Sequence, residues 1–453
     1  MLWYTDRSAY LTGVGRCPRE RYLSRHSGPT GYGLVRVAES LPLVTGTHVH
    51  MALEGLLRYL QETDQLPSLE VVQAEIARAV TAYEARVAAR GYRGLLGGES
   101  VESVLVEQQC LLGGLVWAFN RTLLPWIHRE FRVVAVEQER VYVLDCTCGL
   151  PPAAGHEAHR DRDCAGIGLQ LRQDVLAERR RGGGLAYLEF KTSGRTADTF
   201  AEQWETRPQF GLGTLMAPGE VTELYVIGLA KGQRRKDTTT GGLYQASPFC
   251  YGYCRPGNPP LTTEDWLPSY QWIDEEGRTR RAPRDYVRTP ISALLHSGYL
   301  ADVATSLPDV IRAWVDVLPE PTVREQVFLV GPLNRQDAQL AALLRGITAE
   351  ERRWQDRLWT LYGAAQAGLS WADPQFQAEL DRLVPQSWEC RRFGSRHECE
   401  FAELCFQRQG WQDPIGGGRY QPRCPHHTPE LEQAVARGLL VEQTAGPTED
   451  EED

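Results

Sequence analysis

The sequence predicts an α/β protein with a central mixed sheet flanked by helices, because two kinds of hydrophobic periodicity alternate along the chain. Apolar residues recur at the spacing of a helix face in residues 48–61, 69–90, 101–128, 199–217, 322–345, 348–366 and 374–384. They alternate as in a strand in residues 131–137, 140–144, 167–176, 185–191 and 221–229. A Cys/His/Pro-rich loop interrupts the strands at residues 146–164. Residues 231–290, rich in Gly, Pro, Thr and Arg, have poor prospects for a core of their own.

The composition is that of an ordinary folded protein. The chain has 453 residues, 42% hydrophobic and 24% charged, which at roughly 150 residues per domain allows about three domain-equivalents. No run of about 18 apolar residues and no signal-type N-terminal stretch occurs, so we expect a cytoplasmic protein without a membrane span. The net charge of −10 excludes a wholly basic nucleic-acid coat but allows a local basic groove.

The eleven cysteines are an odd number and form clusters in the sequence. In a chain without an export signal, clustered cysteines are better interpreted as metal ligands than as disulfides. Cys390, Cys399 and Cys405 need a fourth thiolate to complete a tetrahedral sulfur site, and Cys17 supplies it if the chain ends meet. Spacing alone allows Zn²⁺ or an iron–sulfur cluster. The alternative is a set of unrelated buried thiols.

A second set of sulfur and imidazole groups lies in the loop that interrupts the strands. A zinc ion held by three sulfurs and one imidazole would give this loop of about 20 residues something to fold around. The candidate ligands are Cys146, Cys148, His156, His159 and Cys164. Cys250 and Cys254 are alternatives to the histidines. The other interpretation is a loop of thiols without a metal.

The most informative segment is a predicted β-hairpin at residues 169–191, where two strand-like runs flank a glycine-rich turn. Side chains alternate along a strand, so Glu189 and Lys191 share one face and Phe190 points to the other. Asp174 and Glu189 are equidistant from the turn centre, and a symmetric hairpin places them opposite one another, about 5 Å apart. Such anions repel unless a cation lies between them, and hard oxygen ligands favour Mg²⁺ or Mn²⁺. The alternative is a solvated strand edge with a Glu–Lys pair.

A histidine upstream is a further candidate ligand. His50 and Glu54 lie four residues apart and so share a helix face, and the imidazole is expected to project toward a neighbouring sheet. His48 competes for this role, although it would point elsewhere on the helix. The alternative is a buried, hydrogen-bonded histidine.

Several motifs follow one another in a definite order. They are Cys17-Pro18-Arg19-Glu20-Arg21-Tyr22-Leu23, then Gly46, His50 and Glu54 as GxxxHxxxE, the strand residue Asp174, Glu189-Phe190-Lys191, a glutamine-bearing helix, and the three late cysteines. This order resembles the RecB-like branch of the PD-(D/E)XK nuclease superfamily, and more narrowly its iron–sulfur members, such as the AddB nuclease domain and the CRISPR adaptation nucleases. The resemblance covers about residues 1–60, 131–230 and 385–410.

The sequence departs from the family pattern at two places. Leu171 stands where the family usually has Gly, three residues before the strand aspartate. Gln209 is followed by Gly213 at the tyrosine place of QxxxY, and the second candidate, Gln203, has Arg207 there. These departures affect how the helix would grip DNA and leave the metal ligands untouched.

The resemblance implies a restriction-endonuclease-like fold and a role for named residues. His50, Asp174, Glu189 and the Phe190 carbonyl would bind a divalent metal, Lys191 would be the catalytic lysine, and Gln209 would belong to the same site. Cys17, Cys390, Cys399 and Cys405 would hold a 4Fe-4S cluster. Among basic residues, Arg179, Arg180 and Arg181 lie in the hairpin turn next to the proposed site and are candidate contacts to the DNA backbone.

Six segments are expected on this basis. They are 1–130, with a cluster cysteine and helices; 131–230, the nuclease core with its insertion at 146–164; 231–320, an irregular insertion; 321–384, helical; 385–425, the iron–sulfur segment; and 426–453, an acidic tail.

The implied function is a Mg²⁺- or Mn²⁺-dependent DNA nuclease of RecB-like exonuclease type, acting in DNA repair, recombination or defence. No GxxxxGK[ST] loop occurs, so a helicase or recombinase partner would be another chain. Two other classes stay open: a non-catalytic nucleic-acid-binding or scaffold subunit of a helicase–nuclease complex, and a zinc-stabilised interaction protein.

Overall fold

The computed structural model divides the chain into two compact units. The terminal unit contains residues 1–38, 143–170 and 342–453, and the central unit contains residues 39–142 and 171–341. This division is coarser than the six predicted segments, and it gathers Cys17 and the late cysteines into one unit. The described residues are 2–6, 10, 17–27, 33–37, 39–90, 92–93, 101–146, 166–194, 200–201, 204, 209–215, 221–236, 243–255, 267, 271–273, 278–283, 285–296, 306–333, 337–369, 373–386, 399, 401, 404–405 and 420–422.

A mixed sheet lies at the centre of the central unit, as predicted. Its strands are β5 (Phe131–Cys146), β6 (Gly166–Arg179), β7 (Leu185–Ser193), β8 (Val221–Ala230) and β15 (Val327–Leu333). The order is β1-β6-β7-β8-β15, where β1 (Leu2–Asp6) pairs with the start of β6, and β5 also pairs with β6. The pair β6–β7 is antiparallel, β7–β8 is parallel and β8–β15 is antiparallel. The division between the two units falls within β5 and β6.

Three element predictions need correction. The helices predicted at 322–345 and 348–366 have other bounds, because β15 interrupts the first and residues 337–366 form one helix. The strands predicted at 131–137 and 140–144 are the single strand β5. Residues 327–333, predicted as part of a helix, form β15, because an apolar run with β-branched and aromatic residues pairs with β8. Short apolar runs do not distinguish a buried helix from a buried strand by periodicity alone.

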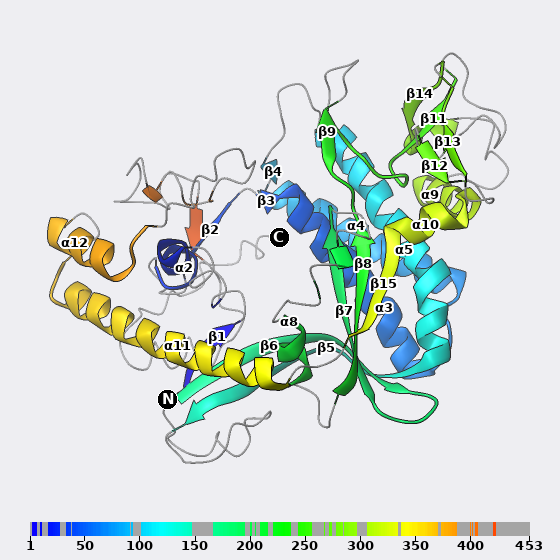
Figure 1. Cartoon of the computed structure of the whole chain (residues 1–453). Helices are drawn as coiled ribbons and strands as arrows, with labels where there is room; N and C mark the ends of the chain where they lie inside the picture. The colour runs from blue at the N-terminus through cyan, green and yellow to red at the C-terminus, as the bar shows by residue number, and fades with distance from the viewer. Residues whose placement is uncertain are drawn as a thin grey trace, which may run out of the picture. The chain divides into compact units, whose positions relative to one another are not determined.

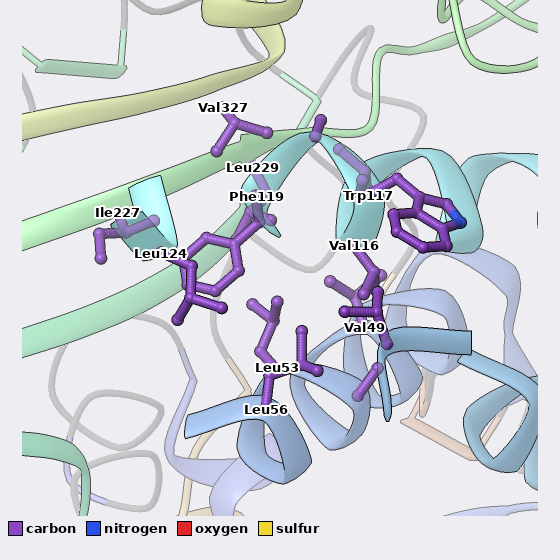
Figure 2. Packing of buried hydrophobic residues seen from close by; sticks show 14 of the residues in the cluster. Val49, Leu53, Leu56, Val116, Trp117, Phe119, Leu124, Ile227, Leu229 and Val327 are labelled. Atoms are coloured by element: carbon purple, nitrogen blue, oxygen red, sulfur yellow. The ribbon is translucent and has the colours of Figure 1, made fainter. Parts of the chain in front are cut away.

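Helices cover one face of this sheet (Figure 1). The helices on the sheet are α3 (Leu41–Thr63), α5 (Val101–Glu130) and α10 (Glu320–Gln326). In turn, α4 (Leu69–Arg90) packs on α3 and α5, and α9 (Leu307–Val317) packs on α5. Figure 2 shows α3, α5, β8 and β15 meeting in the core through side chains such as Leu53, Phe119, Ile227 and Val327. Leu188 and Phe190 of β7 join this core, whereas Tyr187 packs in a separate cluster with Leu176 and Trp204. The alternation predicted for β7 is therefore confirmed.

Among the described helices, α5 is the one long and apolar enough to cross a membrane by length and composition. In the structure, 67% of its apolar stretch is buried inside the protein. Leu115, Val116 and Phe119 are completely buried. A helix that is apolar and covered on most sides behaves as the core helix of a large unit.

The segment at 231–320 forms short antiparallel pairs. β9 (Arg234–Lys236) pairs with β10 (Leu243–Gln245), β11 (Tyr251–Cys254) with β14 (Val287–Pro290), and β12 (Gln271–Ile273) with β13 (Thr279–Arg281). The 3₁₀ helix η2 (Ile291–His296) follows them, and elsewhere β3 (Glu39–Ser40) pairs with β4 (Tyr92–Arg93). The buried residues Phe249, Cys250, Cys254 and Ile291 belong to the main core. The packing agrees with a segment that has no core of its own.

The terminal unit joins the two ends of the chain in one core. Its elements are β1 (Leu2–Asp6), which pairs with the start of β6, α2 (Pro18–Arg25), α11 (Asp337–Gln366), α12 (Pro374–Leu383), and β2 (Leu34–Arg36), which pairs with β16 (Tyr420–Pro422). Leu23 of α2 packs in the same cluster as Trp354 of α11 and Leu380 of α12. Figure 1 shows these three helices. A site shared between Cys17 and the late cysteines requires this meeting of the ends.

A buried ion pair fixes α2 to α11. Both Arg21 terminal nitrogens donate to the Glu351 carboxylate, at 2.9 and 2.6 Å, and the two side chains are 1% and 0% exposed. The Arg21 guanidinium also lies 4.4 Å from the centre of the Trp354 ring. A bidentate pair of this kind is costly to break from one side, because it leaves a buried charge without compensation.

Glu351→Ala should therefore lower the free energy of unfolding of the terminal unit by about 3–5 kcal/mol. The double variant Arg21→Met/Glu351→Met should recover most of this loss, because it removes both charges. Urea denaturation followed by tryptophan fluorescence measures both. As control, Arg382→Ala breaks an exposed pair with Glu379 and should cost under about 1 kcal/mol. Equal effects of Glu351→Ala and Arg382→Ala would contradict the assigned role of the pair.

Candidate active site

Three side chains suited to bind a metal converge in the central unit. A ring nitrogen of His50 on α3 and carboxylate oxygens of Glu137 on β5 and Asp174 on β6 lie within 4.8 Å of one another. All three side chains are partly buried. One imidazole and two carboxylates form a donor set that suits Mg²⁺ or Mn²⁺. The sequence predicts His50 and Asp174 as ligands and misses Glu137.

Glu137 reaches this position through an unusual backbone conformation. Its φ of 48° lies in the left-handed region, which residues other than glycine rarely adopt. This interruption of regular strand geometry within β5 re-aims the side chain, and the carboxylate forms an ion pair with Arg172 of β6. Left-handed backbone at a non-glycine residue costs free energy and is concentrated at functional sites. In the sequence, its signal is the polar run 137–140, where the first predicted strand ends and the second begins.

A backbone hydrogen bond fixes the Asp174 carboxylate. The hairpin has the predicted register at Val175, which pairs with Leu188, but the pairing of β6 with β7 ends there and does not reach Asp174 and Glu189. The Asp174 carboxylate instead accepts a hydrogen bond of 2.7 Å from the Phe190 backbone N–H. A carboxylate held by a fixed backbone donor has a defined orientation, as a metal ligand needs.

Glu189 lies beside the three-ligand group but is not a member of it. Its carboxylate accepts a hydrogen bond from the Tyr187 hydroxyl and forms an ion pair with Lys191. These three residues occupy alternate positions of β7, as predicted, so each is close to the next on the same face. The Lys191 ammonium also donates to the Phe190 carbonyl oxygen at 3.1 Å. Glu137, which the sequence does not predict as a ligand, thus joins His50 and Asp174, while Glu189 and the Phe190 carbonyl contact Lys191. Metal binding by Glu189 and by the Phe190 carbonyl stays a prediction.

Burial and like charge control the protonation of these groups. Burial, with a further contribution from Glu189, raises the pKa of Asp174 to about 8. Burial likewise raises the pKa of Glu137 above its usual value. Burial and the Lys191 charge lower the pKa of His50 to about 4, so its imidazole is neutral at pH 7 and keeps a lone pair for a cation. Ionising both carboxyl groups together therefore costs free energy unless a cation compensates.

The other candidates on α3 have separate roles. His48 is buried, with Nδ1 2.7 Å from the Val44 carbonyl oxygen, and its ring meets Tyr83 edge-on. This is the structural histidine that competes with His50 in the sequence. Glu54 accepts two hydrogen bonds from Arg58 one turn later, at 3.0 and 2.8 Å.

The short helix α8 (Gln209–Thr214) explains one departure from the family pattern. Gly213 packs so closely on the Tyr187 ring that a Cβ atom would collide with it. The glycine therefore makes room for a tyrosine that β7 brings to Glu189. The side chain of Gln209, and the residues Gln203 and Arg207, lie outside the described residues.

The arginine triplet lies further from the site than expected. Arg179 is five residues beyond Asp174 along β6, which is roughly 17 Å at 3.3 Å per residue. Its guanidinium donates to Glu223 at 3.0 Å and to the Tyr225 hydroxyl at 2.9 Å, and Arg180 contacts Asp64 and the His128 carbonyl. Arg181 is exposed. DNA contact by these residues stays a prediction, and it applies best to Arg181.

The candidate cluster cysteines belong to the terminal unit. Cys17, at the start of α2, and Cys405 are buried, and Cys399 packs against the core that contains Cys405. Their sulfur atoms do not form a single-ion group within the part of the chain that is described. A 4Fe-4S cluster spaces its thiolates more widely than one ion does. Cys390 lies outside the described residues.

The second predicted metal site is described in part. Cys146 ends β5, and Cys148, His156, His159 and Cys164 lie outside the described residues. Cys250 and Cys254 are buried in the core of the central unit, where their sulfurs contact the Glu107 carbonyl oxygen and the Thr289 hydroxyl. Burial raises the pKa of the Cys250 thiol well above its usual value.

Comparison with known proteins adds no family assignment. The sequence matches no protein-family model and no curated protein. Function is therefore inferred from the geometry of the site and from the order of the motifs.

A bound metal ion should compensate the repulsion between the Glu137 and Asp174 carboxylates. Mn²⁺ at a hundred times its dissociation constant should stabilise the wild-type protein by about 2.7 kcal/mol, read as a rise in melting temperature. At pH 9, where Asp174 is ionised, Asp174→Asn should melt at or above the wild-type temperature without metal, because a buried carboxylate beside Glu189 is gone, and it should lose most of the Mn²⁺ effect.

The matched control is Glu320→Gln, which removes an exposed carboxylate on α10. It should behave like wild type in both measurements. A full Mn²⁺ shift in Asp174→Asn would mean that the cation binds elsewhere.

Proposed function

We propose that this protein is a Mg²⁺- or Mn²⁺-dependent deoxyribonuclease of the RecB-like PD-(D/E)XK type. The observation that carries the proposal is the convergence of His50, Glu137 and Asp174 beside the Glu189–Lys191 pair. These groups come from a helix and three strands far apart in sequence. A merely solvated strand edge does not explain why a helix histidine joins them.

The donor set fits a hard divalent cation. His50, Glu137 and Asp174 would hold it, and Glu189 is near enough to affect the pKa of Asp174. When bound, the cation would polarise a non-bridging phosphate oxygen and lower the pKa of a water molecule. A soft ion such as Cu⁺ is disfavoured, since no sulfur joins this group among the described residues.

The residues of β7 would orient the attacking water. The Lys191 ammonium bridges Glu189 and the Phe190 carbonyl, so it lies at the edge of the ligand group. From there it would position the water and offset the negative charge that grows on the phosphate. Tyr187 holds Glu189 from the other side and keeps the carboxylate from turning away. Hydrolysis would leave a 5′-phosphate and a 3′-hydroxyl, as in the family that the motifs resemble.

We further propose that the terminal unit binds a 4Fe-4S cluster through Cys17, Cys390, Cys399 and Cys405. The common core of α2, α11 and α12 supports this, because it brings the two cysteine-bearing ends of the chain into one unit. The cluster would be structural. The same proposal includes a helicase or recombinase partner, a cytoplasmic location, and a zinc ion at the Cys146 loop.

Cleavage of labelled single- and double-stranded DNA with Mn²⁺ tests the enzymatic claim. Lys191→Met and Glu137→Gln should each lower the rate at least about a hundredfold, because each removes a charge that the transition state needs. Arg324→Met, on the exposed face of α10, should cut at the wild-type rate. Undiminished cleavage by Lys191→Met would point to a contaminating nuclease, and an inactive wild type with normal Mn²⁺ binding to the scaffold alternative.

Anaerobic purification tests the cluster. We expect a brown protein that contains iron, and loss of both colour and thermal stability in Cys17→Ser and Cys405→Ser, because the cluster ties the chain ends together. Cys110→Ser changes a core thiol of the central unit and should keep the colour. A colourless protein that contains zinc alone would favour the zinc-stabilised alternative.

A further inference from the structure

A second ammonium group lies close to the candidate metal site. Lys231 follows β8 directly, and its backbone N–H donates to the Ser193 carbonyl oxygen at 2.7 Å, which extends the contact between β7 and β8. The Lys231 carbonyl oxygen accepts a hydrogen bond of 2.6 Å from Gln245. The main chain is thus held on both sides, and the side chain starts from a fixed point at the carboxyl ends of two parallel strands.

Gly46 allows this side chain to approach α3. A Cβ atom on Gly46 would lie 2.7 Å from the Thr192 hydroxyl oxygen and 3.7 Å from the Lys231 ammonium nitrogen. Gly46 and His50 are four residues apart and share a helix face. A hydroxyl and an ammonium therefore lie one helix turn from the histidine of the metal-ligand group, where any larger residue would have to displace Thr192.

The charge of Lys231 acts on the site. With Lys191 it lowers the pKa of His50, after the larger effect of burial. Lys231 is 9% exposed, and burial lowers its own pKa to about 8. Withdrawing an ammonium so far from water costs free energy.

We propose that Lys231 and the Thr192 hydroxyl bind a backbone phosphate of the DNA strand, next to the phosphate at the metal site. This proposal rests on the proposed nuclease function and deepens it. An ammonium and a hydroxyl are the donors that proteins use for phosphate oxygens, and such contacts set the register of a strand without reading its sequence. Lys191 acts on the phosphate that reacts, whereas Lys231 binds the next phosphate along the strand. Lys231 is therefore a substrate-binding residue.

Salt-dependent binding of a labelled single-stranded oligodeoxynucleotide tests this directly, with Ca²⁺ replacing Mg²⁺ to suppress cleavage. Lys231→Met should weaken binding about tenfold. It should also reduce the slope of log affinity against log salt by about 0.7, the value for one lost phosphate contact on a single strand. Lys231→Arg should restore the slope, and Arg324→Met should match wild type. In cleavage assays, Lys231→Met should raise KM more than it lowers kcat.

Three outcomes would overturn the proposal. One is a wild-type slope and KM in Lys231→Met while wild type cuts DNA; the nuclease function then stands without this subsite. Another is a lower melting temperature in Lys231→Met that Lys231→Arg repairs, with no change in slope; the lysine is then structural. The last is a wild type that neither binds Mn²⁺ nor cuts DNA, which removes the proposed function as well.

Discussion

The rest of the site depends on one constraint. Three carboxyl groups lie close together and are largely withdrawn from water. The Glu189 charge raises the pKa of both Asp174 and Glu137, after the larger effect of burial, and Glu137 adds to the rise at Asp174. Each is met by a cation or a fixed donor: Arg172, the Phe190 N–H, and Lys191 with Tyr187. Apolar residues at such positions would give the folded protein a higher free energy of unfolding. The arrangement makes physical sense as a preformed group of acidic side chains for a divalent cation.

The core of the central unit holds these groups in place. Phe190 lies between Glu189 and Lys191 in the sequence, and its side chain is buried. Its ring meets the ring of Phe119 on α5 edge-on, with 5.6 Å between the ring centres. Because side chains alternate on a strand, anchoring Phe190 in the core fixes the direction of the two functional residues beside it. The same core anchors α3 through Val49 and Leu53, on either side of the site residue His50. Packing and chemistry are thus coupled within single elements.

The sequence predicts the strands and their register better than it predicts which side chains from distant elements meet in the folded protein. Alternation was enough to predict that Glu189 and Lys191 share a face, and turn symmetry predicted the pairing that Val175 and Leu188 show. Glu137 was out of reach, because its role depends on a left-handed backbone within β5 and on contacts with two other elements. The choice of His50 over His48 likewise depends on which neighbour each side chain meets. Residues 327–330 were misassigned because an apolar run acquires its conformation from its partner β8.

The most direct measurement is an anomalous difference map from a crystal soaked in Mn²⁺. The account predicts a peak roughly 2.1 Å from a His50 nitrogen and from Asp174 and Glu137 oxygens, with Lys191 nearby. Soaking at a concentration that supports DNA cleavage ties that peak to activity. If Mn²⁺ supports cleavage while the peak is absent from these side chains, the ligand group proposed for this protein is not the one that acts.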